Sequence, residues 1–470
     1  MQNEKGLLFC KNFFDQEKAQ QKKGPFIQKL SIKITPNAKS LSSFSGLNLF
    51  VDLFSKFDVA KIFAQYLPQK IRDRGISSSQ KFFSAVLGFI AGAECLDDFD
   101  SLGFDPLFSQ LTGSPSAITL GKFLRGFSLR QIEQIGSLLP IVALRMRSWL
   151  RPSFSKIIFR MDGTSHQQFG EKMEGVEWNY KNIRCLSSQN LFDDLGLCYG
   201  FTLRAGAVHS SVGAIEMMER AFKSVPLYVQ KYFVADSAYA SLEIYNTLLV
   251  NKVSFAICLP EPAWRPLLEN YGSKVKWESS KIKFFGQNKC EIGSCIYSKK
   301  GLSMGRKFLR VVFIRTKKKE ILAGDNHPYH YYAIVTDLSY SEMNNEQVIK
   351  FYRKRAQVEN NIKDLKNGMD FHHFPCQSLK ANNVWGLMGI IAYNLMRVAS
   401  FALYPQTGCF VKTVRRNLVT IAGEVICHAR SLEIRLMNFL AKEVNRLSMI
   451  LSSAFLRMNV RIFEGTNVPP

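Results

Sequence analysis

The sequence predicts an α/β protein built on a mixed sheet, with a basic β-rich insertion and helical regions on either side. Strand-like and helical segments alternate after residue 155, a strongly basic stretch interrupts them, and helical periodicity dominates the two ends. The length of 470 residues allows roughly two to four domains. We expect a flexible tail at 1–30, a helical region at 31–150, the sheet domain at 151–260 and 330–405, the insertion at 261–329, and a C-terminal helical region at 406–470.

The N-terminal part reads as a polar tail followed by helices. The alternating "KLSIKIT" predicts a short strand, and helical patterns then continue to residue 150 with breaks at "RDRGISSSQ", "SLGFDP" and "TGSPSAIT". The piece "SPSAITLGKFLRGFSLRQIEQI" resembles a short helix-turn-helix with Ser/Thr caps and the basic residues Lys122, Arg125 and Arg130. The alternative is a small helical bundle with a solvated basic face.

The pattern changes at Ser155 to alternating strands and helices. "KIIFRMDGTS" and "KYFVADSAYAS" predict strands that end in the carboxylates Asp162 and Asp236. "LCYGFTLRAG" and "VSFAICLP" predict further strands, and "AIEMMERAFKSV" and "LEIYNTLLVNK" predict helices. Acids at strand ends lie where α/β folds commonly place chemistry, although a single Asp there is more often a turn or helix cap.

The stretch 261–329 holds 15 Lys/Arg and only 6 Asp/Glu, and "KFLRVVFIRTK" predicts a strand within it. The segment "YHYYAIVTDLS" then returns to the character of a core strand. The following "SYSE" at 339–342 matches a capping box, so we expect the helix that carries Glu359 to begin there. Gly368 is suited to the position that ends this helix.

Charge is the strongest clue to a partner. Lys plus Arg number 62 against 38 Asp plus Glu, a net charge of +24, which favours nucleic acid and, as an alternative, an anionic membrane surface. The apolar run "VWGLMGIIAYNLMRVASFALYP" is broken by Asn394 and Arg397 and predicts a buried helix. The N-terminus has no signal-peptide pattern, and the 10 cysteines have neither disulfide-framework nor zinc-site spacing. We therefore expect a reduced, cytoplasmic protein without a membrane partner.

One helical stripe mixes an acid, two bases and an aromatic ring. In "FYRKRAQVENNIKDLKNG", steps of three, four and seven residues place four side chains within about a 60° stripe. These side chains are Tyr352, Arg355, Glu359 and Lys366. A solvated helix more often scatters its charges around its polar face, although Glu359 alone also fits an ordinary surface pair.

Asp162, Asp236 and Glu359 form the candidate catalytic and metal-binding set. Mg²⁺ and Mn²⁺ prefer hard oxygen ligands, and three carboxylates at one sheet edge can hold two such ions about 3.5–4 Å apart. Such a pair activates water and stabilises the leaving oxygen of a phosphodiester. Arg355 and Lys366 would then face DNA phosphates, and Tyr352 would contact a sugar or a phosphate.

These residues resemble the insertion-sequence transposases that carry an Asp-Asp-Glu triad on a ribonuclease-H-like fold. The stripe matches a subgroup's Tyr-x2-Arg-x3-Glu-x6-Lys signature. More narrowly, the chain is similar to the bacterial insertion-sequence group numbered thirteen-eighty, from about residue 30 to 440. Blocks that look like that group's are "RDRGISSSQKFFSAVLGFIAGAECLDDFDSLGFDPLF", "PSAITLGKFLRGF", "DGTSHQQFGEKMEGVEWNYK", "LRAGAVHSSVGAIEM" and "VADSAYAS".

The resemblance implies a DNA transposase. It implies binding of double-stranded DNA at the terminal inverted repeats, cleavage and strand transfer with two Mg²⁺ ions (Mn²⁺ as a substitute), and synapsis as a homodimer. Hairpin formation on the excised ends and a cytoplasmic, nucleoid-associated location follow in the same way. Region 31–150 is expected to bind the element's ends, with Lys122 and Arg125 as candidate DNA contacts.

Two positions depart from the family pattern. Tyr332 stands where related enzymes often carry a Trp, so we expect it to stack on a DNA base, or else to pack within a core strand. The second-acid block reads "ADSAYA", where an Asp-x-Gly form is common. Two other classes of function stay open: a catalytically silent or domesticated DNA-binding protein, and a polybasic protein that binds RNA or membrane.

Overall fold

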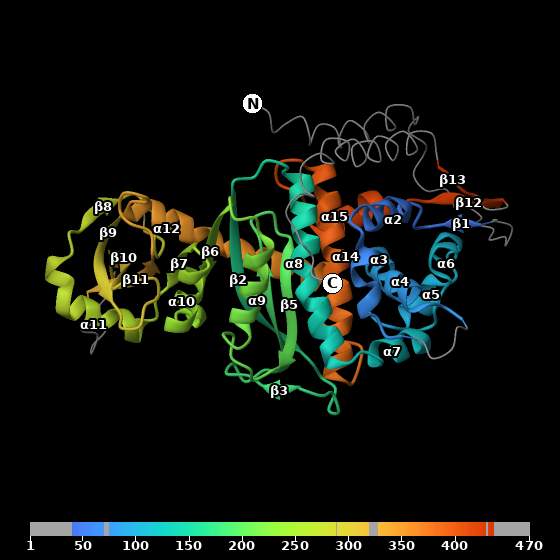
Figure 1. Ribbon diagram of the computed structural model, residues 1–470, viewed down its shortest axis with the longest axis horizontal. Coiled ribbons are helices and arrows are strands. Elements are labelled where there is room, and N and C mark those ends of the chain that lie inside the picture. Colours follow the sequence, from blue (N-terminus) through green and yellow to red (C-terminus); the bar gives the residue numbers. More distant parts are fainter. Residues whose placement is uncertain (1–39, 70–74, 288, 319–327, 429–430, 437–470) are drawn as a thin grey trace, which may run out of the picture.

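The computed structural model describes residues 40–69, 75–287, 289–318, 328–428 and 431–436. The expected tail at 1–30 and the expected "KLSIKIT" strand lie outside these residues. A large sheet runs from the middle of the molecule to the end where the insertion lies, and the N-terminal helices lie at the other end (Figure 1).

Ten strands in the described residues form one mixed sheet, so the predicted α/β fold class is confirmed. Their order is β3-β4-β2-β6-β7-β11-β10-β9-β8, and β5 also pairs with β4. The central strands β2, β6 and β7 are parallel, and the remaining pairings are antiparallel. Parallel strands are covered on both faces, which is why these three read as apolar runs. Their bounds are Lys156–Gln167 (β2), Glu177–Trp178 (β3), Arg184–Phe192 (β4), Cys198–Ala205 (β5), Gln230–Ala235 (β6) and Val253–Cys258 (β7).

Strand β4 was missed by the sequence analysis, which took the segment around Cys198 as the second strand. Its sequence "RCLSSQNLF" carries a run of polar residues, yet Ser188, Gln189 and Asn190 are buried. Their side chains make interior hydrogen bonds: Gln189 donates to the carbonyl of Ser210 at 2.6 Å, and Asn190 donates to the hydroxyl of Ser188 at 3.0 Å. The polar residues that kept this segment from being predicted as a strand therefore make hydrogen bonds in the protein interior and do not face solvent.

The basic insertion extends the same sheet. The strands within it are β8 (Glu278–Ser280), β9 (Cys290–Ser298) and β10 (Phe308–Lys317). They join the sheet through β11 (Tyr329–Thr336), the strand that begins the returning part of the sheet domain and pairs with both β10 and β7. Helix α11 (Glu261–Tyr271) precedes them, and helix α12 (Asn345–Arg353) packs across β7, β9, β10 and β11. Helices α9 (Ala214–Ser224) and α10 (Leu242–Val250) occur where the sequence predicts them.

The N-terminal region is a set of helices, and the last of them is the longest. Ser116 and Ser128 cap α7 and α8, as the predicted helix-turn-helix requires. However, α8 packs on β5 and α14, so the second helix of this motif also supports the large sheet. The helices are Leu47–Lys56 (α2), Val59–Phe63 (α3), Ser78–Ala91 (α4), Asp98–Leu102 (α5), Pro106–Thr112 (α6), Ala117–Arg125 (α7) and Leu129–Leu150 (α8).

Helix α14 (Leu379–Leu403) is the predicted buried helix. By length and composition it could cross a membrane, but 83% of its apolar window is buried inside the protein. It contacts α4, α7, α8 and β5, and lies between the sheet and the N-terminal helices (Figure 1). Asn394, which interrupts its apolar run, bonds both backbone groups of Cys198 at 2.8 Å, so the polar residue serves core packing.

The described part of the predicted C-terminal helical region differs from the prediction. After the short α15 (Val411–Val414) and a π-helical turn, the chain forms β12 (Gly423–His428) and β13 (Ser431–Arg435). These strands join β1 (Leu41–Ser42) in a separate three-stranded sheet. Local periodicity could not predict this sheet, because β12 pairs with a strand almost 400 residues earlier in the chain.

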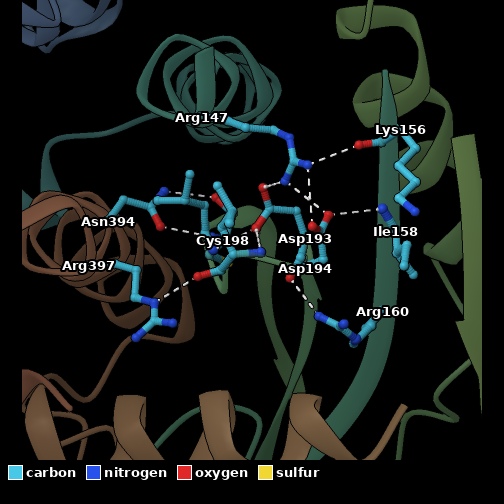
Figure 2. Close-up of polar contacts among 11 residues, drawn as sticks. Arg147, Lys156, Ile158, Arg160, Asp193, Asp194, Cys198, Asn394 and Arg397 are labelled. Atoms are coloured by element: carbon cyan, nitrogen blue, oxygen red, sulfur yellow. Dashed lines mark hydrogen bonds and ion pairs between the residues drawn. The ribbon is translucent and has the colours of Figure 1, made fainter. Parts of the chain in front are cut away.

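A buried ionic cluster fixes α8 to the large sheet (Figure 2). Arg147 on α8 contacts Asp193 at 2.8 Å and Asp194 at 2.9 Å in the β4–β5 turn, and donates to the carbonyl of Lys156 in β2 at 3.0 Å. Asp194 in turn accepts the backbone N–H of Ile158 at 3.1 Å. The cluster therefore sets the position of the strand that carries Asp162.

Candidate active site

Asp162 lies within β2 and not at its end, which corrects the prediction. The parallel pairing of β2 with β6 ends at Met161, which lies opposite Ala235. The antiparallel pairing of β2 with β4 continues to Gln167. Asp162 is therefore the first residue of β2 beyond the parallel ladder. The strand was predicted too short because its second half, "DGTSHQ", lacks the apolar run of its first half.

Asp236 directly follows β6, as predicted, and so stands one position beyond Ala235 at the same edge of the sheet. Its carboxylate also accepts the backbone N–H of Ala238 at 3.0 Å and caps a 3-10 turn, Ser237–Tyr239. Asp236 is therefore a turn cap, the alternative role that a single Asp at a strand end suggested. The cap orients the carboxylate through Oδ1, and Oδ2 does not take part in it.

The helix of Glu359 begins later than predicted and is interrupted. Ser339 and Glu342 do form the reciprocal capping bonds, but around a turn, and α12 starts at Asn345 with its own capping box. A 3-10 segment, Lys354–Ala356, separates α12 from α13 (Gln357–Gly368). Gly368 is the last helical residue and Met369 is the C-cap, so Gly368 lies two positions before the C′ place predicted for it.

Arg355, in this 3-10 segment, stands between two of the candidate acids. Its guanidinium lies 2.8 Å from Oε1 of Glu359 and 3.9 Å from Oδ2 of Asp162. Burial, and after it the charge of the nearby Asp236, raise the pKa of Asp162 to about 7, although the Arg355 charge opposes the shift. The three acids thus create a strongly negative site that one arginine partly neutralises.

The donor set suits a divalent metal, but the described side chains do not form a closed metal site. No group of three His, Cys, Asp or Glu among the described residues is arranged to hold an ion. Arg355 occupies the position between the acids, and Glu359 is 58% exposed. Asp162, Asp236 and Glu359 do carry the hard oxygens that Mg²⁺ or Mn²⁺ prefers, so the residue types suit such an ion.

The two tyrosines predicted to contact DNA are packed together. Tyr352 is 6% exposed, and its hydroxyl lies 2.7 Å from that of Tyr332, with the ring centroids 5.8 Å apart. Burial raises the pKa of Tyr352 to about 12. The pair ties strand β11 to the end of α12, and Tyr332 is not an exposed stacking surface in this arrangement.

The basic residues predicted to contact DNA fall into two groups. Lys366 donates to the carbonyl of Ser165 at 2.7 Å, so it binds α13 to the extension of β2, and burial lowers its pKa. Lys122 and Arg125 are exposed on α7. They belong to the N-terminal helices and contact none of the triad residues.

Sequence reasoning missed the residues that hold β2 against the segment after α13. His166 donates from Nδ1 to the carbonyl of Phe371 and accepts from Ser188 through Nε2 at 2.8 Å. Its pKa is lowered to about 3 by burial, so the ring is neutral. Gln168 donates to the carbonyl of His372 at 2.9 Å. The only signal in the sequence was the polar run "DGTSHQQ" after an apolar strand.

A mixed sheet with acids at the end of its parallel strands and on a following helix defines the ribonuclease-H-like class. The family model described as "Transposase DDE domain group 1" matches residues 25–451, nearly the whole chain. The chain therefore belongs to this family of DDE transposases. A search of curated proteins finds no match.

Replacing Arg355 by alanine is expected to raise the Mn²⁺ affinity of the DNA-free protein about two- to tenfold. The guanidinium competes with cations for the carboxylates, and partly exposed ion pairs are each worth about 0.2–1 kcal/mol. Isothermal titration calorimetry, or electron paramagnetic resonance of free Mn²⁺, measures this directly. Lys354→Ala removes an equal charge from the neighbouring residue, which contacts neither acid, and equal affinities in the two variants would contradict the competition.

Proposed function

We propose that this protein is a DNA transposase that binds the terminal inverted repeats of its element and carries out metal-dependent strand cleavage and strand transfer. Family membership supports the transposase class. The observation that supports catalysis most is the contact of one arginine, Arg355, with carboxylates from a strand and a helix far apart in sequence. A protein that only held DNA would have no use for such a concentration of acids.

In this proposal Asp162, Asp236 and Glu359 hold two Mg²⁺ ions, with Mn²⁺ as a substitute. Bound metal would polarise the scissile phosphate and lower the pKa of the attacking water. Arg355 would exchange its carboxylate partners for a DNA phosphate, because a planar guanidinium binds both in the same bidentate way. Lys366 would fix α13 against β2 while remaining close to the backbone of the DNA.

The N-terminal helices are proposed to recognise the repeat through α7. Replacing Lys122 and Arg125 together by alanine is expected to weaken repeat binding and to reduce the slope of log K against log salt by about 1.8, or about 0.9 for each lost phosphate contact. Fluorescence anisotropy at several salt concentrations measures both quantities. Arg220→Ala with Lys223→Ala, on exposed positions of α9, is the charge-matched control. Equal slopes in the two double variants would place recognition elsewhere.

The further details rest on resemblance alone and belong to the same proposal. They are the insertion-sequence group numbered thirteen-eighty, a homodimer in the synaptic complex, hairpin ends, a base-stacking role for Tyr332 once its packing is released, and a cytoplasmic, nucleoid-associated location.

The alternative is a catalytically silent DNA-binding protein derived from a transposase. Incubating the protein with DNA that carries the repeats flanking its gene, with and without Mg²⁺, separates the two. Mg²⁺-dependent cleavage at the repeat ends supports the transposase, whereas specific binding without cleavage supports the silent protein. A protein that binds RNA or membrane but not this DNA would overturn both.

A further inference from the structure

The connection between β2 and β4 presents three large aromatic side chains to solvent. Phe169, Trp178 and Tyr180 are 74%, 65% and 89% exposed. We call residues 168–183 the aromatic hairpin, because β3 within this segment pairs back onto β4. Single exposed apolar side chains are common on protein surfaces, but several large ones gathered in one short segment mark an interaction surface.

The tip of the aromatic hairpin is held in one shape by Asn179, which is 7% exposed. Its amide donates to the hydroxyl of Ser165 in β2 at 2.9 Å. Its side-chain oxygen accepts the backbone N–H groups of Lys181 at 2.9 Å and Ile183 at 3.0 Å. The exposed rings on either side of Asn179 are therefore carried by an ordered turn, which lowers the entropy that binding would cost.

The other side of the aromatic hairpin is fixed to the start of α14. The backbone N–H of Glu174 donates to the carbonyl of Gln377 at 2.8 Å, and its carboxylate accepts the backbone N–H of Leu379 at 3.0 Å. Gly175 follows with a φ of +80°, and a Cβ there would lie 3.0 Å from the side chain of Leu379. The hairpin and the N-terminus of α14 therefore form one continuous surface.

The segment before α14 also connects the aromatic hairpin to α7, the helix proposed to recognise the repeat. Helix α14 contacts α7. Burial raises the pKa of the Cys376 thiol and the nearby charge of Arg125 lowers it, so the basic end of α7 lies close to this segment. Strand β3 and α7 lie along the same lower edge of the molecule in Figure 1. The aromatic hairpin is therefore placed between α7 and the strand that carries Asp162.

Charge favours DNA as the occupant of this surface. The tip at 178–182 carries Lys181 and no acid. Two of the three acids in the hairpin, Glu174 and Glu177, accept backbone N–H groups from other parts of the fold, and the third, Glu171, is followed directly by Lys172. A chain with a net charge of +24 repels a second copy of itself and attracts duplex DNA.

We propose that the aromatic hairpin packs into a groove of the repeat duplex about five base pairs inside the cleaved end. Gln167 stands five residues beyond Asp162 on β2, a rise of about 17 Å, which corresponds to about five base pairs of duplex. The rings of Trp178 and Tyr180 pack against sugars and base edges, and Lys181 contacts a phosphate.

This contact holds the duplex at a fixed distance between α7 and the acids, and so determines which phosphate reaches the active site. All bases remain paired in this arrangement. The inference rests on the proposed function and adds to it a contact surface between repeat recognition and cleavage.

The test uses the full chain in EDTA, so that DNA is bound without being cut. Fluorescence anisotropy compares a long duplex, which carries the flanking repeat with its cleavage point, with a short duplex that lacks the outermost helical turn. Trp178→Ala with Tyr180→Ala is expected to weaken binding of the long duplex about 10- to 100-fold, the range for removing aromatic side chains that become buried. Binding of the short duplex should stay unchanged, because that duplex reaches only α7.

The matched control is Leu227→Ala with Tyr228→Ala. These side chains are 97% and 81% exposed in the turn before β6, at the edge of the sheet opposite to Asp236, so their loss should affect neither duplex. Trp178→Phe with Tyr180→Phe keeps both rings and should retain most of the affinity. Hydroxyl-radical footprints of wild-type protein and of the alanine variant should differ only in the outermost helical turn.

The outcomes separate the inference from the proposed function. Equal binding of the long duplex by wild-type protein and the alanine variant would overturn the inference while repeat binding stands. Equal weakening of both duplexes would also overturn it, because the hairpin would then act through α7. Sedimentation without DNA tests the other occupant: a dimer that the alanine substitutions dissociate would assign the surface to a second copy of this chain and refute the DNA contact. Failure of wild-type protein to bind either duplex would instead contradict the proposed function itself.

Discussion

Replacing Asp162 by asparagine is expected to lower the rate of strand cleavage by about 1,000-fold or more, while binding of the repeat persists or strengthens. The change keeps the size of the side chain but removes a charged oxygen donor. Metal supplies several kcal/mol of transition-state stabilisation, and each 1.36 kcal/mol is tenfold in rate. Removing one acid also lowers the repulsion of phosphate, so binding has no reason to fall. Cleavage of end-labelled repeat DNA in Mg²⁺, beside anisotropy in its absence, measures both.

The matched control is Glu346→Gln, which removes one negative charge from an exposed pair on α12. It should cleave at close to the wild-type rate. The same loss is expected for Asp236→Asn and Glu359→Gln, because the proposal gives all three acids the same task. An Asp162→Asn protein that cleaves normally would refute the triad, and a variant that neither cleaves nor binds would point to misfolding, which circular dichroism checks.

The second large effect concerns stability. Arg147→Met is expected to lower the free energy of unfolding by about 3–5 kcal/mol, because the Asp193 carboxylate, with no exposed side-chain surface, is left without its buried cationic partner. Such a loss is a large part of the roughly 5–15 kcal/mol that stabilises a domain. Urea unfolding followed by tryptophan fluorescence gives the difference.

A control lies two residues away on the same helix. Arg145 pairs with Asp58 at 3.0 Å, but both side chains are well exposed, so Arg145→Met should cost less than about 1 kcal/mol. Adding Asp193→Asn to Arg147→Met should recover part of the loss, because it removes the unpaired charge. Similar losses in the two single variants would show that the cluster contributes no more than a surface pair.

The fold class and the order of the candidate acids could be predicted because they depend on local chemistry. Apolar runs predicted the parallel strands before Asp162 and Asp236, since strands covered on both faces admit few polar residues. The basic insertion and the helix of Glu359 followed from composition and spacing. Where polar residues face the interior, as in β4 and the second half of β2, the same reasoning failed, because hydrogen bonds inside a fold look like solvent exposure in a sequence.

By itself the sequence determined the class of the protein, and it predicted the three candidate acids and the spacing of the segment that carries Arg355, because these depend on residue type and on order along the chain. Only the tertiary structure decided how they meet. It placed Arg355 between Glu359 and Asp162, turned Tyr332 onto Tyr352, and extended the sheet through the insertion. It also paired β12 with β1. Apart from the local Arg355–Glu359 pair, these contacts join separate segments of the chain, and no local preference specifies a contact whose partner is brought near only by packing of the whole core.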